Sequence, residues 1–140
     1  MAIVWQVRDD AERVLGQRRA FRSCLSSIAE HDASDIDAAE LIYGELVANA
    51  MRHAKGAVEA RLELEDSECA VLTVRDHGPG MHVYPWTPHR DPYAESGRGL
   101  AIVELLARET AVESAEDGGT IVRATLPVRP RDGADRVTSC

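Results

Sequence analysis

Apolar and charged residues alternate in the segment 57–65, and this pattern constrains the fold more than any other feature of the chain. The apolar positions are Val58, Ala60, Leu62 and Leu64, and the residues after them are Glu59, Arg61, Glu63 and Glu65. Such alternation predicts a strand with one buried face and one solvated face. The segment 68–76 shows a second apolar parity at Ala70, Leu72 and Val74. The two strands form a predicted hairpin that turns at Asp66-Ser67, and its apolar face must be covered by other elements.

The rest of the chain supplies that cover. Ser34 is the predicted N-cap of a helix, with Asp37 three residues later in the manner of a capping box. In chain order the predicted elements are a strand at 2–7, a helix from Asp9 or Asp10 to about Ala29, a break at 31–33, a helix at 35–54, strands at 57–65 and 68–76, a buried helix at 100–107, and strands at 110–114 and 120–127. This order predicts a two-layer α/β (α+β) sandwich, with helices on one face of a mixed, largely antiparallel sheet.

Length, charge and composition narrow the class of protein. A chain of 140 residues with 44% hydrophobic residues fits one domain, predicted at 1–128, with a disordered polar tail at 129–140. A net charge of -8 argues against a nucleic-acid partner. No apolar run is long enough to cross a membrane, and the N-terminus turns acidic too early for a signal peptide, so we expect a cytoplasmic protein. The cysteines show no zinc-binding spacing.

A polar stripe runs along the predicted helix at 35–54. Glu45, Asn49 and His53 are four residues apart and therefore share one face. The apolar stripe of the same helix is formed by Ile42, Leu46 and Ala50. The polar stripe therefore lies at the edge of the core, where a carboxylate and an amide can hold hydrated Mg²⁺ and orient a hydroxyl. Taken alone, the stripe is more typical of a solvated helix edge.

The second strand of the first hairpin ends in Asp76-His77-Gly78-Pro79-Gly80-Met81. Asp76 shares the parity of the buried residues, and a buried carboxylate is costly unless it is hydrogen-bonded. An adenine amino group is a suitable partner, and Gly78 and Gly80 let the backbone approach a flat ligand closely. An ordinary turn at a strand end is the alternative interpretation.

Residues 77–96 have no apolar periodicity, and a loop of that length inside a compact domain is usually functional. Gly97, Arg98 and Gly99 then precede the predicted third helix. Backbone N–H groups at a helix N-terminus favour a phosphate, and an arginine adds a fixed cation. A junction that needs small residues for packing is the alternative.

Gly118-Gly119-Thr120 marks the last predicted hairpin. Thr120 shares the parity of Val122, Ala124 and Leu126, so its hydroxyl is expected to face inward. By itself this pattern is also that of a plain hairpin.

The order of these motifs is more specific than any one of them. The chain reads Glu-x-x-x-Asn, then Asp-x-Gly-x-Gly, then Gly-x-Gly-Leu, then Gly-Thr. In this order it resembles the GHKL, or Bergerat-fold, ATP-binding family, which includes histidine kinases and anti-sigma-factor kinases. The resemblance covers roughly residues 35–127. The segments 45–54, 76–81, 96–100 and 119–120 look like the family's N box, its two glycine boxes and its last short motif.

The resemblance implies a role for each matching residue. Asp76 would bind the adenine amino group, Gly78, Gly80 and Met81 would shape that pocket, and Thr120 would close it. Gly97, Arg98, Gly99 and Leu100 would meet the phosphates, and residues 81–96 would form the ATP lid. Asn49 would ligate Mg²⁺, His53 would lie beside the nucleotide as part of the N box, and Glu45 would act as general base.

The spelling Ser-Gly-Arg-Gly-Leu, the short lid and the chain length resemble the anti-sigma-factor serine/threonine kinase branch. That branch implies binding of a sigma factor, phosphorylation of a serine on a STAS-domain antagonist, and possible homodimers. A non-catalytic ATP-binding module that acts by sequestration and a detached histidine-kinase-like domain are the alternatives. The chain contains no Gly-Lys pair, so a Walker A loop is excluded.

Overall fold

A computed structural model of the chain describes residues 2–7, 11–53, 58–65, 68–77 and 95–134. Of residues 2, 5–7, 11–15, 53 and 95–98 it describes the backbone alone. The predictions for the turn at 66–67, for Gly78, Gly80 and Met81, and for lid residues 81–94 lie outside the described residues.

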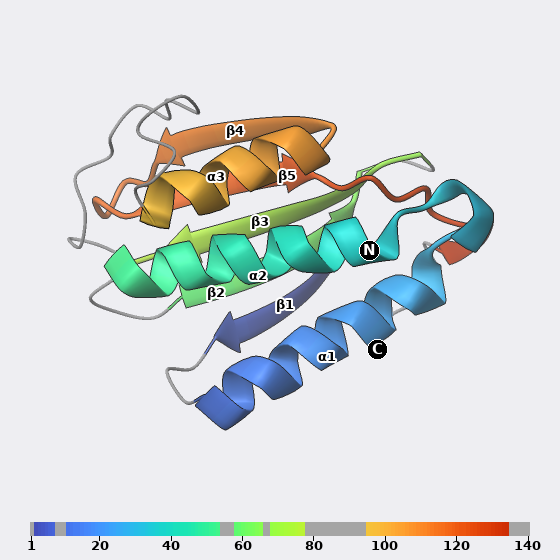
Figure 1. Ribbon diagram of the computed structural model, residues 1–140, viewed down its shortest axis with the longest axis horizontal. Coiled ribbons are helices and arrows are strands. Elements are labelled where there is room, and N and C mark those ends of the chain that lie inside the picture. The colour runs from blue at the N-terminus through green and yellow to red at the C-terminus, as the bar shows by residue number, and fades with distance from the viewer. Residues whose placement is uncertain (1, 8–10, 54–57, 66–67, 78–94, 135–140) are drawn as a thin grey trace.

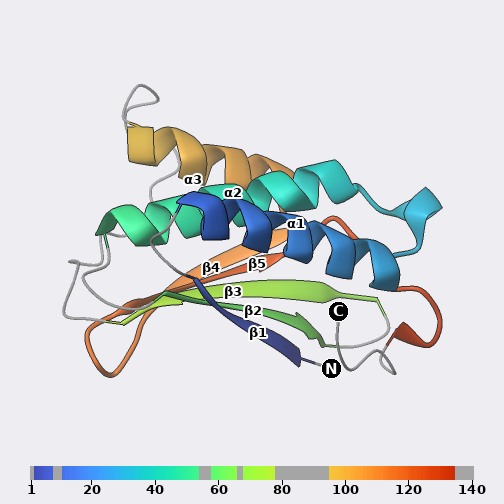
Figure 2. The same ribbon diagram turned by 90° about the horizontal axis from the view of Figure 1, so that it is seen from below.

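The described residues form two layers, as the sequence predicts. One layer is a five-stranded sheet in the order β1-β2-β3-β5-β4, and three α-helices cover one of its faces (Figures 1 and 2). The strands are β1 (Ala2–Val7), β2 (Val58–Leu64), β3 (Ala70–Asp76), β4 (Glu109–Ser114) and β5 (Thr120–Thr125). The helices are α1 (Ala11–Ile28), α2 (Ile36–His53) and α3 (Glu95–Leu106), with a 3-10 turn at His31–Ala33. Every strand pair among the described residues is antiparallel, so no parallel pair of a mixed sheet is present there.

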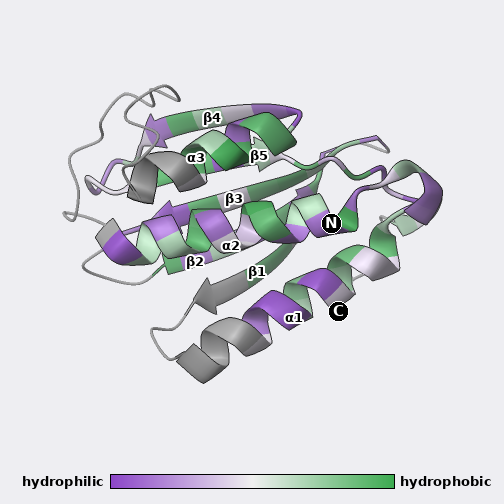
Figure 3. Ribbon diagram, in the orientation of Figure 1, coloured by the Kyte–Doolittle hydropathy of each residue, from purple (hydrophilic) through white to green (hydrophobic). Residues whose placement is uncertain are grey.

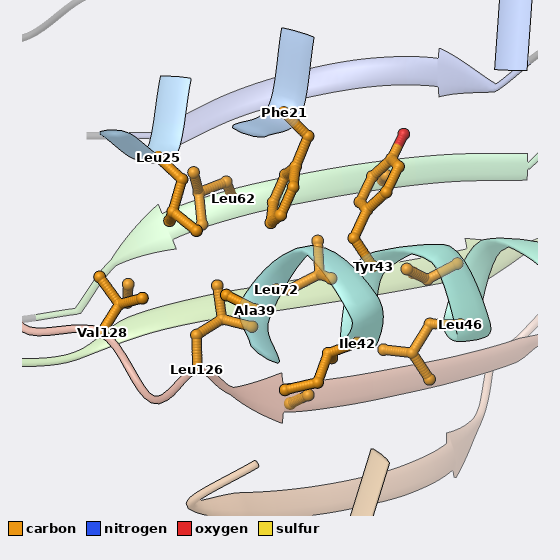
Figure 4. Packing of buried hydrophobic residues seen from close by; sticks show 14 of the residues in the cluster. Phe21, Leu25, Ala39, Ile42, Tyr43, Leu46, Leu62, Leu72, Leu126 and Val128 are labelled. Atoms are coloured by element: carbon orange, nitrogen blue, oxygen red, sulfur yellow. The ribbon is translucent and has the colours of Figure 1, made fainter. Parts of the chain in front are cut away.

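The core lies between the helices and the sheet. The predicted inward positions of β2 and β3 are buried except Leu64, which is half-buried against the core; the buried ones are Val58, Ala60, Leu62, Ala70, Leu72 and Val74. The ring of Phe21 from α1 stacks on that of Tyr43 from α2, with centroids 4.4 Å apart and an interplanar angle of 14° (Figure 4). Aromatic pairs at such a distance add to the stability gained from their buried area. Helix α2 packs its predicted apolar stripe, Ile42, Leu46 and Ala50, into this core.

Helix α2 is capped by Asp35 and not by Ser34. The Ala38 N–H donates to Asp35 Oδ1 at 3.0 Å, which satisfies one of the unpaired donors of the first turn. The Ser34 hydroxyl instead bonds to the backbone of Arg129. It accepts from the Arg129 backbone N–H at 2.9 Å and lies 3.3 Å from the Arg129 carbonyl oxygen. The predicted Ser34 cap is therefore wrong by one residue, because a contact distant in sequence takes its hydroxyl.

Helix α3 differs from its prediction in two ways. It begins at Glu95, so Gly97, Arg98 and Gly99 lie inside its first turns and do not precede it, and the predicted lid loses residues 95–96. Glycine disfavours a helix by only about 1 kcal/mol, which tertiary packing easily offsets. The helix is also not buried throughout. Val103 is fully buried, whereas Leu105 is 84% exposed, although this helix is among the most apolar in Figure 3.

The segment after β5 is ordered further than the predicted boundary at residue 128. Pro130 forms an isolated antiparallel bridge with Ala29, and the Arg131 N–H donates to the Ile28 carbonyl at 2.8 Å. Val128 and Ala134 are buried. The segment 129–134 therefore packs against the end of α1, because its apolar residues find cover there, and the predicted disordered tail is wrong for these residues. Residues 135–140 lie outside the described part of the chain.

Within the described part of the chain, no helix is both long enough and apolar enough to cross a membrane.

Candidate functional site

The described elements that carry residues singled out by the sequence meet at one end of the molecule. The C-terminal part of α2, the end of β3, the first turns of α3 and the β4–β5 turn all lie at the left in both views (Figures 1 and 2). This convergence follows from the topology. Strand β3 ends there, β5 starts there in antiparallel register, and α3 begins at the same end.

Asn49 is the buried member of the α2 polar stripe. Its side chain is 8% exposed, and its Oδ1 has no hydrogen-bond partner among the described residues. A buried amide oxygen without a partner is costly, so its presence points to a ligand or an ion that accepts its lone pairs. His53 is the last residue of α2, and its side chain is outside the description.

Glu45, one turn earlier, lies half-buried against α3. A Cβ atom built on Gly99 would lie 2.5 Å from Glu45 Oε2 and 3.5 Å from its Cδ. The missing side chain of the buried Gly99 therefore makes room for this carboxylate. Leu100, the next residue, is half-buried and packs against the core.

Asp76 and Thr120 join β3 to β5 at the end of the sheet. Both are buried, at 3% and 4% exposure, as their parity predicted. The Thr120 N–H donates to Asp76 Oδ1 at 3.0 Å. Thr120 Oγ1 is buried with no partner among the described residues, so it is a second polar atom with unused hydrogen-bonding capacity.

The β4–β5 turn is closed by its own backbone and by one aspartate. The Ala115 N–H donates to Gly119 at 2.8 Å, and Gly118 has a φ of 87°, a conformation that glycine adopts without strain. The Gly119 N–H donates to Asp117 Oδ1 at 2.9 Å. The pKa of Asp117 is lowered, mainly by this hydrogen bond from the Gly119 backbone and to a smaller extent by the nearby His77 and Arg75 side chains. The sequence analysis missed Asp117, although an aspartate before Gly-Gly is a recognisable turn residue.

The described residues fit a nucleotide and a magnesium ion. Unused oxygen atoms of Asn49 and Thr120 lie at the same end of the fold as the Asp76 carboxylate. Mg²⁺ prefers oxygen ligands and keeps several waters, so one side-chain oxygen with phosphates is sufficient to hold it. No group of three or more acidic, histidine or cysteine side chains that would form an all-protein metal cage is found among the described residues.

A comparison with protein-family models decides the family. The model described as "Histidine kinase-like ATPase domain" matches residues 7–126, most of the chain. The chain belongs to this family. ATP binding follows from this membership, and the resemblance to the GHKL superfamily is confirmed at this level.

Two solved structures of histidine kinases are similar to the chain. The mycobacterial sensor histidine kinase MprB superposes with a TM-score of 0.56 at 21% identity, covering 94% of this chain and 100% of that one. A second match, the histidine kinase AdeS of Acinetobacter baumannii, has a TM-score of 0.46 at 20% identity and covers 89% of this chain and 66% of that one. No curated protein matches the chain. The likeness to MprB confirms the two-layer α+β architecture with its antiparallel sheet.

Proposed function

We propose that the chain is an ATP- and Mg²⁺-dependent serine/threonine protein kinase of the anti-sigma-factor type. The observation that carries the proposal is the pairing of Glu45 with Asn49 on one face of α2. One of these side chains is a half-buried carboxylate, and the other ends in a buried oxygen without a partner among the described residues. Phosphoryl transfer needs positioned phosphates, neutralised charge and an oriented hydroxyl, and this pair suits the last two needs.

The adenine side of the proposed site is formed by Asp76 and Thr120. Asp76 would accept a hydrogen bond from the adenine amino group while its Oδ1 keeps the Thr120 N–H. The hydroxyl of Thr120 would bind the base directly or through water. Gly78, Gly80 and Met81 are proposed to line the same pocket on the strength of the sequence resemblance, and residues 81–94 are proposed as the lid.

The phosphate side is proposed at the start of α3. Gly97 is the third residue of α3, so its N–H has no partner within the helix, and the helix dipole favours negative charge there; Arg98 and Gly99 follow it in the first turns. Asn49 would hold Mg²⁺ through Oδ1, and His53 is proposed beside the nucleotide. When bound, the ion neutralises negative charge on the phosphate oxygens.

Glu45 is the proposed general base. Its half-buried side chain would take the proton of a hydroxyl on a partner protein. The hydroxyl oxygen then forms a bond to the γ-phosphorus, the bond from that phosphorus to the β–γ bridging oxygen breaks, and ADP leaves. The acceptor we propose is a serine on a STAS-domain antagonist. The proposed partner that the chain sequesters is a sigma factor. We further propose that the protein is cytoplasmic and forms homodimers. The proposed partners rest on the sequence resemblance alone.

Nucleotide binding is tested first. Calorimetric titration of ADP and ATP with Mg²⁺ into wild type should give binding that Asp76→Asn abolishes, since the substitution replaces an acceptor oxygen by a donor. Asp37→Asn is the matched control, because Asp37 is an 85% exposed carboxylate in the first turn of α2, at the end of that helix away from the site. Asn49→Ala should reduce the Mg²⁺ dependence of ATP binding. Absence of binding by wild type would refute the ATP site.

Transfer is tested with Glu45→Gln, which should keep ATP binding and lose phosphorylation of a STAS-domain substrate. Glu113→Gln, an exposed carboxylate on β4, should transfer normally. An acid-stable phosphoprotein supports serine phosphorylation. An acid-labile product would identify a histidine-kinase-like enzyme, and nucleotide binding without transfer to any partner would identify a non-catalytic module.

A further inference from the structure

The Asp117 carboxylate connects the β4–β5 turn to the end of β3. One of its oxygens, Oδ1, accepts the Gly119 N–H of its own turn at 2.9 Å. The other, Oδ2, lies 3.3 Å from His77 Nδ1 and 3.5 Å from Arg75 Nη2. Both oxygens are therefore used, one inside the turn and one across to the neighbouring segment.

This connection flanks Asp76 and Thr120. Arg75 and His77 are the residues before and after Asp76, and Gly119 directly precedes Thr120. The hydrogen bond from the Thr120 N–H to the Asp76 carboxylate thus lies between the two halves of the Asp117 contact. His77 also occupies the variable position of the Asp-x-Gly-x-Gly segment, so a side chain of that segment reaches the turn before Gly-Thr.

The ion pairs of this connection are weak stabilisers of the fold. Asp117, Arg75 and His77 are each more than a third exposed, and exposed charge pairs contribute little to the free energy of unfolding. Their geometric effect is larger, because a turn that is fixed before binding does not lose entropy when a ligand arrives.

We infer that Asp117 is a positioning residue for the adenine side of the nucleotide site, holding Gly119 and Thr120 in register with Asp76. The inference rests on the proposed ATP site. Without Asp117, the turn keeps the backbone bonds of Ala115 with Gly118 and Gly119, and Thr120 keeps its bond to Asp76. The link from the turn to Arg75 and His77 is lost, so Gly119 and Thr120 are held less rigidly before the base binds.

The test compares Mg²⁺-ADP with Mg²⁺-GDP as probes. Asp117→Ala should weaken ADP binding about tenfold and GDP binding little, so the ADP-over-GDP preference falls by about the same factor. Asp117→Asn keeps an acceptor for the Gly119 N–H and should lose only part of the preference. Glu113→Gln is the control, since Glu113 lies on β4 of the same hairpin and pairs with Arg123 at 3.8 Å.

A second measurement needs no nucleotide. Hydrogen exchange at the Gly119 and Thr120 amides should be faster in Asp117→Ala and unchanged in Glu113→Gln. An unchanged ADP-over-GDP preference in Asp117→Ala overturns the positioning role. Equal loss of both nucleotides together with a lower Tm also overturns it and shows a general structural role. Absence of ADP binding by wild type overturns the proposed function, and the positioning role with it.

Discussion

Replacing Gly99 by alanine should separate the stability of this protein from its activity. The new Cβ would lie 2.5 Å from Glu45 Oε2, closer than two such atoms can remain. The next contact, Glu45 Cδ at 3.5 Å, is an ordinary one. Only the end of a flexible side chain is displaced, so we expect the carboxylate to rotate away while the backbones of α2 and α3 keep their places.

The two energetic effects on folding oppose one another. Alanine favours a helix over glycine by about 1 kcal/mol. Moving Glu45 to a less favourable rotamer costs about 0.5–1.5 kcal/mol. The free energy of unfolding should therefore change by less than about 1 kcal/mol. A displaced general base should lower phosphoryl transfer by about a hundredfold or more.

The assay pairs chemical denaturation with single-turnover transfer from ATP. Gly16→Ala in α1 is the control, because a Cβ there meets nothing within 4 Å and should stabilise without touching activity. In a Glu45→Ala background, Gly99→Ala should cause no further loss of transfer and should stabilise by about 1 kcal/mol, since the crowded carboxylate is gone. The reasoning would be refuted if Gly99→Ala transferred phosphate at the wild-type rate, or if it lowered the transfer rate by the same factor with Glu45 and with Ala at position 45.

Three other predictions concern the fold. Tyr43→Phe should be neutral or stabilising by up to about 1 kcal/mol in urea unfolding, because the buried Tyr43 hydroxyl has no partner among the described residues. Burial raises the pKa of Tyr43 from 10.0 to about 12, so wild type should lose stability as the pH rises through that range, and a variant that lacks the hydroxyl should lose less. Asp35→Ala should cost about 1 kcal/mol by removing the α2 cap, whereas Ser34→Ala should leave the helix N-terminus unaffected in amide exchange. The pKa of Asp117 is lower in the folded protein than its usual value of 3.8. The contribution of this carboxylate to the free energy of unfolding is therefore complete above pH 3.8 and is lost as the pH falls through the lower folded pKa. An Asp117→Asn variant with the same acid unfolding curve as wild type would contradict this.

Side-chain periodicity within the elements could be predicted from the chain alone. Alternation placed Val58, Leu62 and Leu72 in the core, and the same parity argument placed Asp76 and Thr120 on the buried face, where the structure has them. The helical spacing of Glu45 and Asn49 likewise put both on one face of α2. These predictions succeed because burial of one face is encoded by residues a few positions apart.

Contacts between distant segments were not predictable in this way. The hydroxyl of Ser34 binds Arg129, so the cap passes to Asp35; α3 extends back over its glycines; and segment 129–134 packs against α1. In the first two cases a local preference worth about 1 kcal/mol gave way to packing with a remote part of the chain, and in the third a polar segment gained cover from α1.

The sequence by itself determined which residues face the core and the order of strands and helices along the chain, and it predicted the polar residues that we propose to bind a nucleotide. The tertiary structure alone decided that Gly99 leaves space for the Glu45 carboxylate and that Asp117 connects the β4–β5 turn to the end of β3. The reason is physical. Periodicity is a property of neighbours along the chain, whereas a close approach between α2 and α3, or between a turn and a strand end, exists only once the two layers have packed.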